Sequence, residues 1–194
     1  MKTLYWVLGA IALVVLIIGG VVGWVAGTYN GLVSVDEQVK EAWANVETQY
    51  QRRIDLIPNL VDTVKGFAKQ ELTVFTEVTR MRSQWGEAKT AGNVGQQIAA
   101  ARGLDGAIGR LLLVAENYPQ LKSNENFLKL QDELAGTENR VAVARTRYND
   151  VVKQYNVRTR SFPGNFIAGW FNFTQKTSFE AEAGAEKAPK VSFN

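Results

Sequence analysis

The 194-residue sequence contains neither cysteine nor histidine. Without cysteine the chain can form no disulfide, thiolate nucleophile or zinc–thiolate site. Without histidine it lacks the commonest general base at neutral pH and the commonest metal ligand. An enzyme with this composition would depend on carboxylates, lysine, tyrosine or serine, but no G-x-S-x-G motif occurs and the sequence nominates no carboxylate pair. We therefore expect a non-enzymatic protein without a metal or cofactor.

A basic stripe is also missing. The 22 Lys and Arg residues are interspersed with 19 Asp and Glu residues, which gives a net charge of +3. This pattern does not indicate nucleic-acid binding. Hydrophobic residues make up 46% of the chain, enough to build a packed core.

Charge is absent from residues 4–26, LYWVLGAIALVVLIIGGVVGWVA. As a helix this run would be about 35 Å long, enough to cross a hydrocarbon layer of about 30 Å. Aromatic rings of the kind that membrane interfaces favour stand near both ends: Tyr5, Trp6, Trp24 and Tyr29. The run is too long for the core of a signal peptide, and no A-x-A cleavage site follows it. Residues 1–27 are therefore predicted to be a permanent transmembrane anchor.

Three glycines recur every fourth residue within this anchor: Gly19, Gly23 and Gly27. They share one helix face, and such a face allows two membrane helices to approach closely. The alternative is that glycine is simply common in membrane helices. The first interpretation predicts a homo-oligomer that pairs through the bilayer.

Beyond the anchor, apolar residues recur every three or four positions, and no alternating run of strand length appears before residue 160. This period predicts four amphipathic helices, over about 32–57, about 58–88, a third ending at Tyr118, and about 124–160. We expect an all-α protein in which a single transmembrane helix precedes an antiparallel, up-down four-helix bundle. The bundle would occupy residues 28–160, followed by a short aromatic helix over 161–173 and an extended tail over 174–194.

Breaker residues mark the expected joints between these helices. GEAKTAGNVG (86–95) is typical of a loop, and NYPQLKSN (117–124) can end one helix before Pro119 and cap the next with Ser123 or Asn124. Pro58 stands between the first two stripes. It predicts the corner of a helical hairpin, with a kink in one long helix as the competing interpretation.

Arg52, Arg53, Asp55 and Pro58 form the first candidate site. Arg52 and Asp55 are three residues apart and can pair on one helix surface, whereas Arg53 points elsewhere. The favoured role is an ion-pair set that locks the corner. The alternative is a guanidinium patch for an acidic partner or a lipid phosphate.

A polar stripe follows in the fourth predicted helix, made of Glu138, Arg145, Asn149 and Asn156. Polar groups beside an apolar seam usually fix register and partner choice, and a buried polar pocket is the alternative.

In the third predicted helix, glycines recur at every third position: Gly103, Gly106 and Gly109. They suggest a close helix crossing or a soft helix, since the G-x-G-x-x-G order of a phosphate loop is absent.

The stretch FPGNFIAGWFNF (162–173) is aromatic and uncharged. Its candidate membrane-interface residues are Phe166, Ile167, Trp170 and Phe171. The favoured interpretation is a short helix packed on the open end of the bundle, because interfacial helices usually carry Lys or Arg on their polar face. The alternative is an aromatic foot in the membrane interface. The tail after it is small and polar, and is expected to be extended or to bind a partner.

Three long stretches of the chain are similar to the LemA family of bacterial membrane proteins. They are YNGLVSVDEQVKEAWANVETQYQRRIDLIPNLVDTVKGFA (29–68), ENYPQLKSNENFLKLQDELAGTENRVAVARTRYNDVVKQYN (116–156), and FPGNFIAGWFNF with the closing FEAEAGAEKAPKVSF. The resemblance implies one N-terminal membrane helix, an α-helical bundle and no established catalytic residue or cofactor. It also implies a role in membrane organisation, because some relatives are associated with magnetosome membranes.

These observations favour a single-pass scaffold in a bacterial inner membrane, in contact with the lipid bilayer, with copies of itself and with other membrane proteins. The alternative is an adaptor that presents clients to a membrane enzyme such as a protease. Lys2 favours an inside N-terminus with the larger part of the chain outside. The family resemblance instead implies a cytoplasmic domain, so the side of the membrane stays open at this point.

Overall fold

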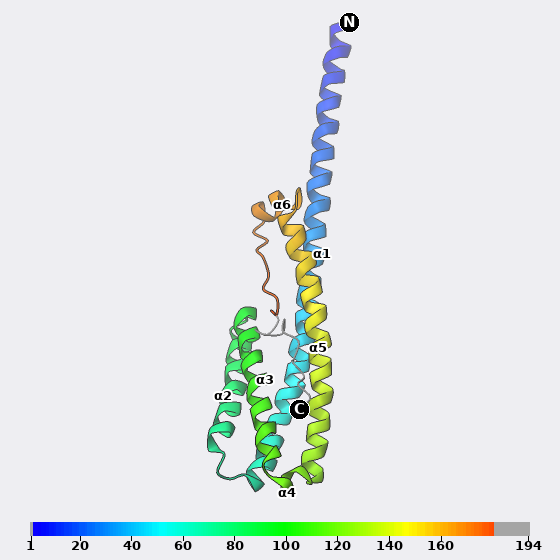
Figure 1. Cartoon of the computed structure of the whole chain (residues 1–194). Coiled ribbons are helices and arrows are strands. Elements are labelled where there is room, and N and C mark those ends of the chain that lie inside the picture. Colours follow the sequence, from blue (N-terminus) through cyan, green and yellow to red (C-terminus); the bar gives the residue numbers. More distant parts are fainter. Residues whose placement is uncertain (1, 181–194) are drawn as a thin grey trace, which may run out of the picture. The chain divides into compact units, whose positions relative to one another are not determined.

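The computed structural model describes residues 2–180, with side chains from residue 5 onward, and all regular structure in this range is helical. The predicted all-α class is therefore confirmed. Figure 1 labels the elements in chain order, which are α1 (Lys2–Phe67), α2 (Leu72–Thr90), α3 (Val94–Glu116), α4 (Pro119–Lys122), α5 (Glu125–Arg160) and α6 (Gly164–Trp170). Two compact units can be distinguished. Among the described residues, unit 1 comprises 2–43 and 150–176, and unit 2 comprises 44–149 and 177–180.

The apolar segment near the start of α1 is uncovered. Its most apolar stretch has a mean hydropathy of 2.6, and none of that stretch is buried by the rest of the chain. Among the described helices, α1 alone is long and apolar enough to cross a membrane. Large apolar side chains from Tyr5 to Trp24 are exposed, as expected of a helix whose surroundings are lipid.

Pro58 lies inside α1, so the predicted hairpin corner at this residue is wrong. The apolar stripe continues across the proline, and Ile57, Leu60, Val61 and Val64 are all buried. Proline costs about 3 kcal/mol inside a helix, whereas burying each large aliphatic side chain contributes about 1.5–3 kcal/mol. Burial on both sides of Pro58 therefore outweighs the propensity of one residue. The chain turns instead at residues 68–71, between α1 and α2.

The other predicted joints lie close to their expected positions. Between α2 and α3, Gly92 has a φ of +65° and Asn93 caps α3, because its Oδ1 accepts a hydrogen bond from the Gln96 N–H at 3.0 Å. Glycine adopts such a positive φ without strain. Asn124 caps α5 in the same way, since its Oδ1 accepts from the Phe127 N–H at 3.1 Å.

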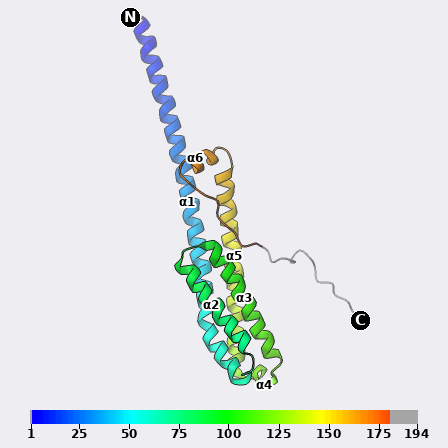
Figure 2. The same cartoon turned by 90° about the vertical axis from the view of Figure 1, so that its left-hand side faces the viewer.

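In unit 2, α2 and α3 form a hairpin and lie side by side in both views (Figures 1 and 2). Its core draws on four long helical segments, from the second part of α1, α2, α3 and the first part of α5. The largest fully buried side chains include Tyr50, Leu60, Trp85, Leu104, Ile108, Leu111 and Tyr148.

In unit 1, α6 packs on the first half of α1. Ile167 and Ala168 of α6 are buried with Leu32 of α1, and Val25 and Tyr29 pack against this group. The chain after α6 has neither helix nor strand up to residue 180, as expected for an extended tail. Residues 181–194 of the predicted tail lie outside the described residues.

Candidate functional site

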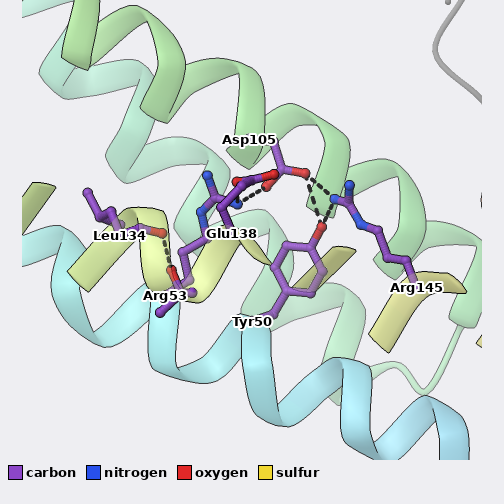
Figure 3. A network of polar contacts seen from close by, with 7 residues as sticks. Tyr50, Arg53, Asp105, Leu134, Glu138 and Arg145 are labelled. Atoms are coloured by element: carbon purple, nitrogen blue, oxygen red, sulfur yellow. Dashed lines mark hydrogen bonds and ion pairs between the residues drawn. The ribbon is translucent and has the colours of Figure 1, made fainter. Parts of the chain in front are cut away.

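A group of charged and polar side chains lies within unit 2 (Figure 3). We call it the charge cluster. It consists of Tyr50 and Arg53 from α1, Asp105 from α3, and Glu138 and Arg145 from α5. Tyr50 and Arg53 are three residues apart on one face of α1, which brings both to α3 and α5.

Asp105 is the shared acceptor of the charge cluster. Its Oδ1 lies 2.9 Å from the Arg53 guanidinium, and its Oδ2 accepts a hydrogen bond from the Tyr50 hydroxyl at 3.0 Å. The Arg145 guanidinium donates to both Asp105 Oδ2 and the Tyr50 hydroxyl. Arg53 also pairs with Glu138. Charge-assisted bonds of this kind are about twice as strong as neutral ones.

Arg53 makes the charge cluster important for folding, since its exposed fraction is 5%. A buried guanidinium without a partner would lose its hydration with no compensation. Two carboxylates and two guanidiniums leave the cluster neutral. Its groups bind one another, so the arrangement fixes how α1, α3 and α5 pack. The Tyr50 ring also stacks on Trp85 of α2, with ring centroids 4.7 Å apart.

The first candidate site is rearranged by these contacts. The predicted pair of Arg52 and Asp55 does not form among the described residues, because Asp55 accepts from Gln51 Nε2 at 2.9 Å and Arg52 is exposed. Arg53, expected to point elsewhere, is the buried member. No corner exists at Pro58 for these residues to lock.

Asp105 was not predicted from the sequence. The available signal was its isolation, because α3 contains no other acidic residue before Glu116. A single carboxylate among glycines and apolar residues indicates a partner in the core.

The polar stripe on α5 has two different partners. Glu138 and Arg145 belong to the charge cluster, whereas Asn149 and Asn156 bind main-chain atoms of the C-terminal segment. The predicted role of the stripe in fixing register stays a prediction. The role of the asparagines was not anticipated, because their partners are 20 and 30 residues away along the chain.

In unit 2, residues 177–180 form a segment that we call the C-terminal strap. The Phe179 N–H donates to Asn149 Oδ1 at 2.8 Å, and Asn149 Nδ2 donates to the Phe179 carbonyl at 2.9 Å. The Tyr148 hydroxyl donates to the Thr177 carbonyl at 2.7 Å, and Arg145 lies 5.0 Å from the centroid of the Phe179 ring. Burial raises the pKa of Tyr148 to about 12.

In unit 1, Asn156 holds Lys176 by the same pair of bonds, at 2.9 Å from the Lys176 N–H and 2.8 Å to its carbonyl. The Lys176 ammonium lies 2.9 Å from Asp36, which also pairs with Lys40 at 3.1 Å. Burial opposes ionisation of Asp36, but the hydrogen bonds and charges of Lys176 and Lys40 outweigh it and lower the pKa of Asp36.

The candidate interface residues of α6 divide into two faces. Phe166, Trp170 and Phe171 are exposed, whereas Ile167 is 1% exposed and belongs to the core with Leu32. The inclusion of Ile167 in an exposed foot was therefore wrong. Tyr29 of α1 contacts the Phe171 ring, with centroids 4.6 Å apart.

The three anchor glycines have open surroundings. A Cβ atom added at Gly19, Gly23 or Gly27 would meet no atom within 4 Å. This face is therefore available to a second helix, and its pairing stays a prediction. Within the described residues, no group of three or more Asp and Glu side chains could hold a metal ion.

Comparisons with known proteins give a family and several relatives. Residues 42–193 match the model of the LemA family. Magnetosome protein MamQ 2 of Paramagnetospirillum magneticum is 27% identical over 201 residues, which cover 90% of this chain and 74% of the relative. Magnetosome protein MamQ of Magnetospirillum gryphiswaldense is 28% identical, over 72% of this chain and 60% of the relative. Protein LemA of Metamycoplasma hominis is 20% identical, over 80% of this chain and 70% of the relative.

Proposed function

This chain belongs to the LemA family, and from that premise we propose that it is a non-enzymatic, single-pass scaffold of a bacterial cell membrane. It would associate with copies of itself and with other membrane proteins. One observation carries this proposal. The apolar start of α1 is wholly uncovered, and the same helix continues into a packed core. An uncovered apolar helix of this length needs lipid around it.

Two further observations support a role in contact and not in turnover. The charge cluster is neutral and its members bind one another, so it is suited to hold helices together. Two of the relatives are named magnetosome proteins, which supports membrane association.

Self-association would use the open face of Gly19, Gly23 and Gly27. Small residues at this spacing let two helix backbones approach closely in lipid. Asn30 lies 11 residues after Gly19 and so close to the same helix face, and it is exposed. Since the chain has no cysteine, Asn30→Cys would introduce a unique thiol beside this face.

Oxidative crosslinking of Asn30→Cys in native membrane vesicles tests the proposal. We expect a covalent dimer, and we expect Gly23→Leu to lower its yield about tenfold because a bulky side chain separates the backbones. Ala10→Leu adds similar bulk on the opposite helix face and should leave the yield unchanged. A monomer at every protein-to-lipid ratio contradicts self-association.

A further inference from the structure

We propose that α6 and its flanking residues insert into the interfacial layer of an anionic bilayer, as a second membrane contact beside the anchor. The inserted group, which we call the aromatic foot, consists of Phe162, Phe166, Trp170 and Phe171. This inference rests on the proposed membrane function, because it takes the start of α1 as the anchor. It adds a lipid-binding surface.

The position of α6 on α1 is the first argument. Ile167 and Ala168 attach α6 to α1 at Leu32, and Val25 and Tyr29 complete the contact. Val25 is within the uncharged run 4–26, and Tyr29 follows that run by three residues, about 5 Å of helix rise. The foot is therefore continuous with the lipid-facing surface of α1.

The exposure of the foot is the second argument. Phe162, Phe166 and Trp170 recur every fourth residue, and their exposed fractions are 79%, 58% and 74%. A set of large aromatic rings that the protein leaves uncovered marks an interaction surface. Tryptophan in particular is favoured at the level of lipid headgroups.

Charge is the third argument, and it answers the objection that the aromatic stretch carries no basic residue. The only charged residues in 158–175 are Arg158 and Arg160, and residues 3–35 of α1 carry none. Both arginines are exposed at the end of α5, and Arg158 donates to the Gly31 carbonyl of α1 at 3.3 Å. The next acid along α1, Asp36, is paired with lysines.

Residues 28–35 and 158–175, which follow the anchor and surround α6, therefore carry aromatic rings and only positive charge. Guanidinium groups bind phosphate oxygens, and basic residues beside a bilayer favour anionic lipids. The combination of buried attachment, exposed rings and two arginines fits a bilayer surface that contains anionic lipid.

Spin labels on single cysteines test this in the full-length protein, reconstituted into phosphatidylcholine vesicles with or without phosphatidylglycerol. Labels would replace Phe166 or Trp170 in the foot, Lys153 on an exposed face of α5, and Val14 in the anchor. Power saturation with oxygen and with a water-soluble nickel chelate reports the depth of each label.

We expect labels at 166 and 170 to collide with oxygen at least about twofold more often than the label at 153, because oxygen concentrates in lipid. Phosphatidylglycerol should deepen them, and Arg160→Gln should remove most of that gain, since each basic residue at a surface contributes roughly fivefold in partitioning. Native Trp170 provides a second measurement, because brominated lipids should quench the fluorescence that Trp170→Phe removes.

Three outcomes overturn the inference. In the first, the labels at 166 and 170 collide with the nickel chelate as often as the label at 153, while the Val14 label stays shielded from it. This result shows an anchored protein without an inserted foot. Shielding from both reagents together with dipolar broadening shows that a second copy covers the foot. A water-exposed Val14 label refutes the anchor itself, and with it the proposed function.

Discussion

At the scale of single residues, Asp105 determines more of the packing than its exposure suggests. Its carboxylate accepts from Arg53, Arg145 and Tyr50. These partners come from two different helices, so the loss of one side chain removes contacts of α3 with both. Arg53 would then depend on Glu138, whose side chain is half exposed.

Asp105→Ala should therefore lower the free energy of unfolding by about 3 kcal/mol, because it removes the less exposed of the two carboxylate partners of the buried Arg53 guanidinium. Thermal unfolding of the detergent-solubilised protein, followed by circular dichroism, measures this change. Asp62→Ala, at an exposed carboxylate on α1, is the matched control and should stay within about 0.5 kcal/mol of the wild type. Equal effects of the two variants would show that the cluster contributes no stability.

Tyr148 gives a pH-dependent prediction. Burial raises its pKa to about 12 from the ordinary 10.0, so the folded state keeps the proton where the unfolded state loses it. The free energy of unfolding is therefore unaffected by this group below pH 10 and decreases as the pH rises from 10 towards 12. Absorbance titration of tyrosinate should show a late component near pH 12 that is absent in Tyr148→Phe. A late component that persists in this variant would assign the raised pKa to another tyrosine.

Residue-level prediction from sequence succeeded where the partner is local and failed where it is distant. The cap of α5 could be placed at Ser123 or Asn124 because helix starts follow short-range rules, and Asn124 is the one used. The partners of Arg53 could not be assigned, because helical spacing identifies a face and not what packs on it.

At the scale of elements, α1 shows that burial can override a helix breaker. The sequence offered both a corner and a kink at Pro58, and the two alternatives have the same local composition. The choice depended on whether the residues after the proline are buried on the same helix, and that is a tertiary property.

Pro58→Ala should raise the melting temperature, because alanine supplies the N–H that proline lacks and can bond the Ile54 carbonyl one turn earlier. We expect a gain of about 1–3 kcal/mol, less if the packing depends on the proline ring. Asn59→Ala, at an exposed neighbour, serves as the control. A loss of stability in Pro58→Ala would favour a turn at this residue.

The glycines of α3 differ in their surroundings. A Cβ at Gly103 would lie 2.5 Å from Met81 Sδ on α2, whereas one at Gly106 or Gly109 would meet nothing within 4 Å. The predicted close crossing therefore applies to Gly103 alone. Gly106→Ala and Gly109→Ala should each stabilise the protein by up to about 1 kcal/mol. Gly103→Ala should be less stable than either in chemical denaturation, because Met81 must move, and equal gains at all three positions would contradict that contact.

At the scale of the whole molecule, the types of element could be predicted from the sequence, whereas the contacts between distant segments could not. The uncharged run and the helical period were sufficient to predict an apolar N-terminal helix long enough to cross a membrane and an all-α fold. The docking of the C-terminal strap could not be derived, because an extended polar segment has no period that reveals a partner.

The C-terminal strap should be released by Asn149→Ala, which removes both hydrogen bonds to Phe179. Each such bond contributes about 1 kcal/mol, so protection of the Phe179 amide from hydrogen exchange should fall by roughly tenfold or more. Asn139→Ala changes an exposed asparagine on the same helix and should have no effect. Unchanged exchange in Asn149→Ala would show that the Tyr148 hydrogen bond and the Phe179 ring are sufficient to hold the strap.

Asn149 and the Tyr148 hydroxyl both form hydrogen bonds with main-chain groups of the strap, at Phe179 and at Thr177 respectively. These hydrogen bonds depend on the spacing of the main-chain groups along the strap and not on the side chains that the bound residues carry. Replacing Ser178 should therefore leave the binding of the strap unchanged. Inserting one residue between 177 and 179 should prevent the hydrogen bonds at Thr177 and at Phe179 from forming together. The length of the strap is therefore more tightly constrained than its amino-acid sequence.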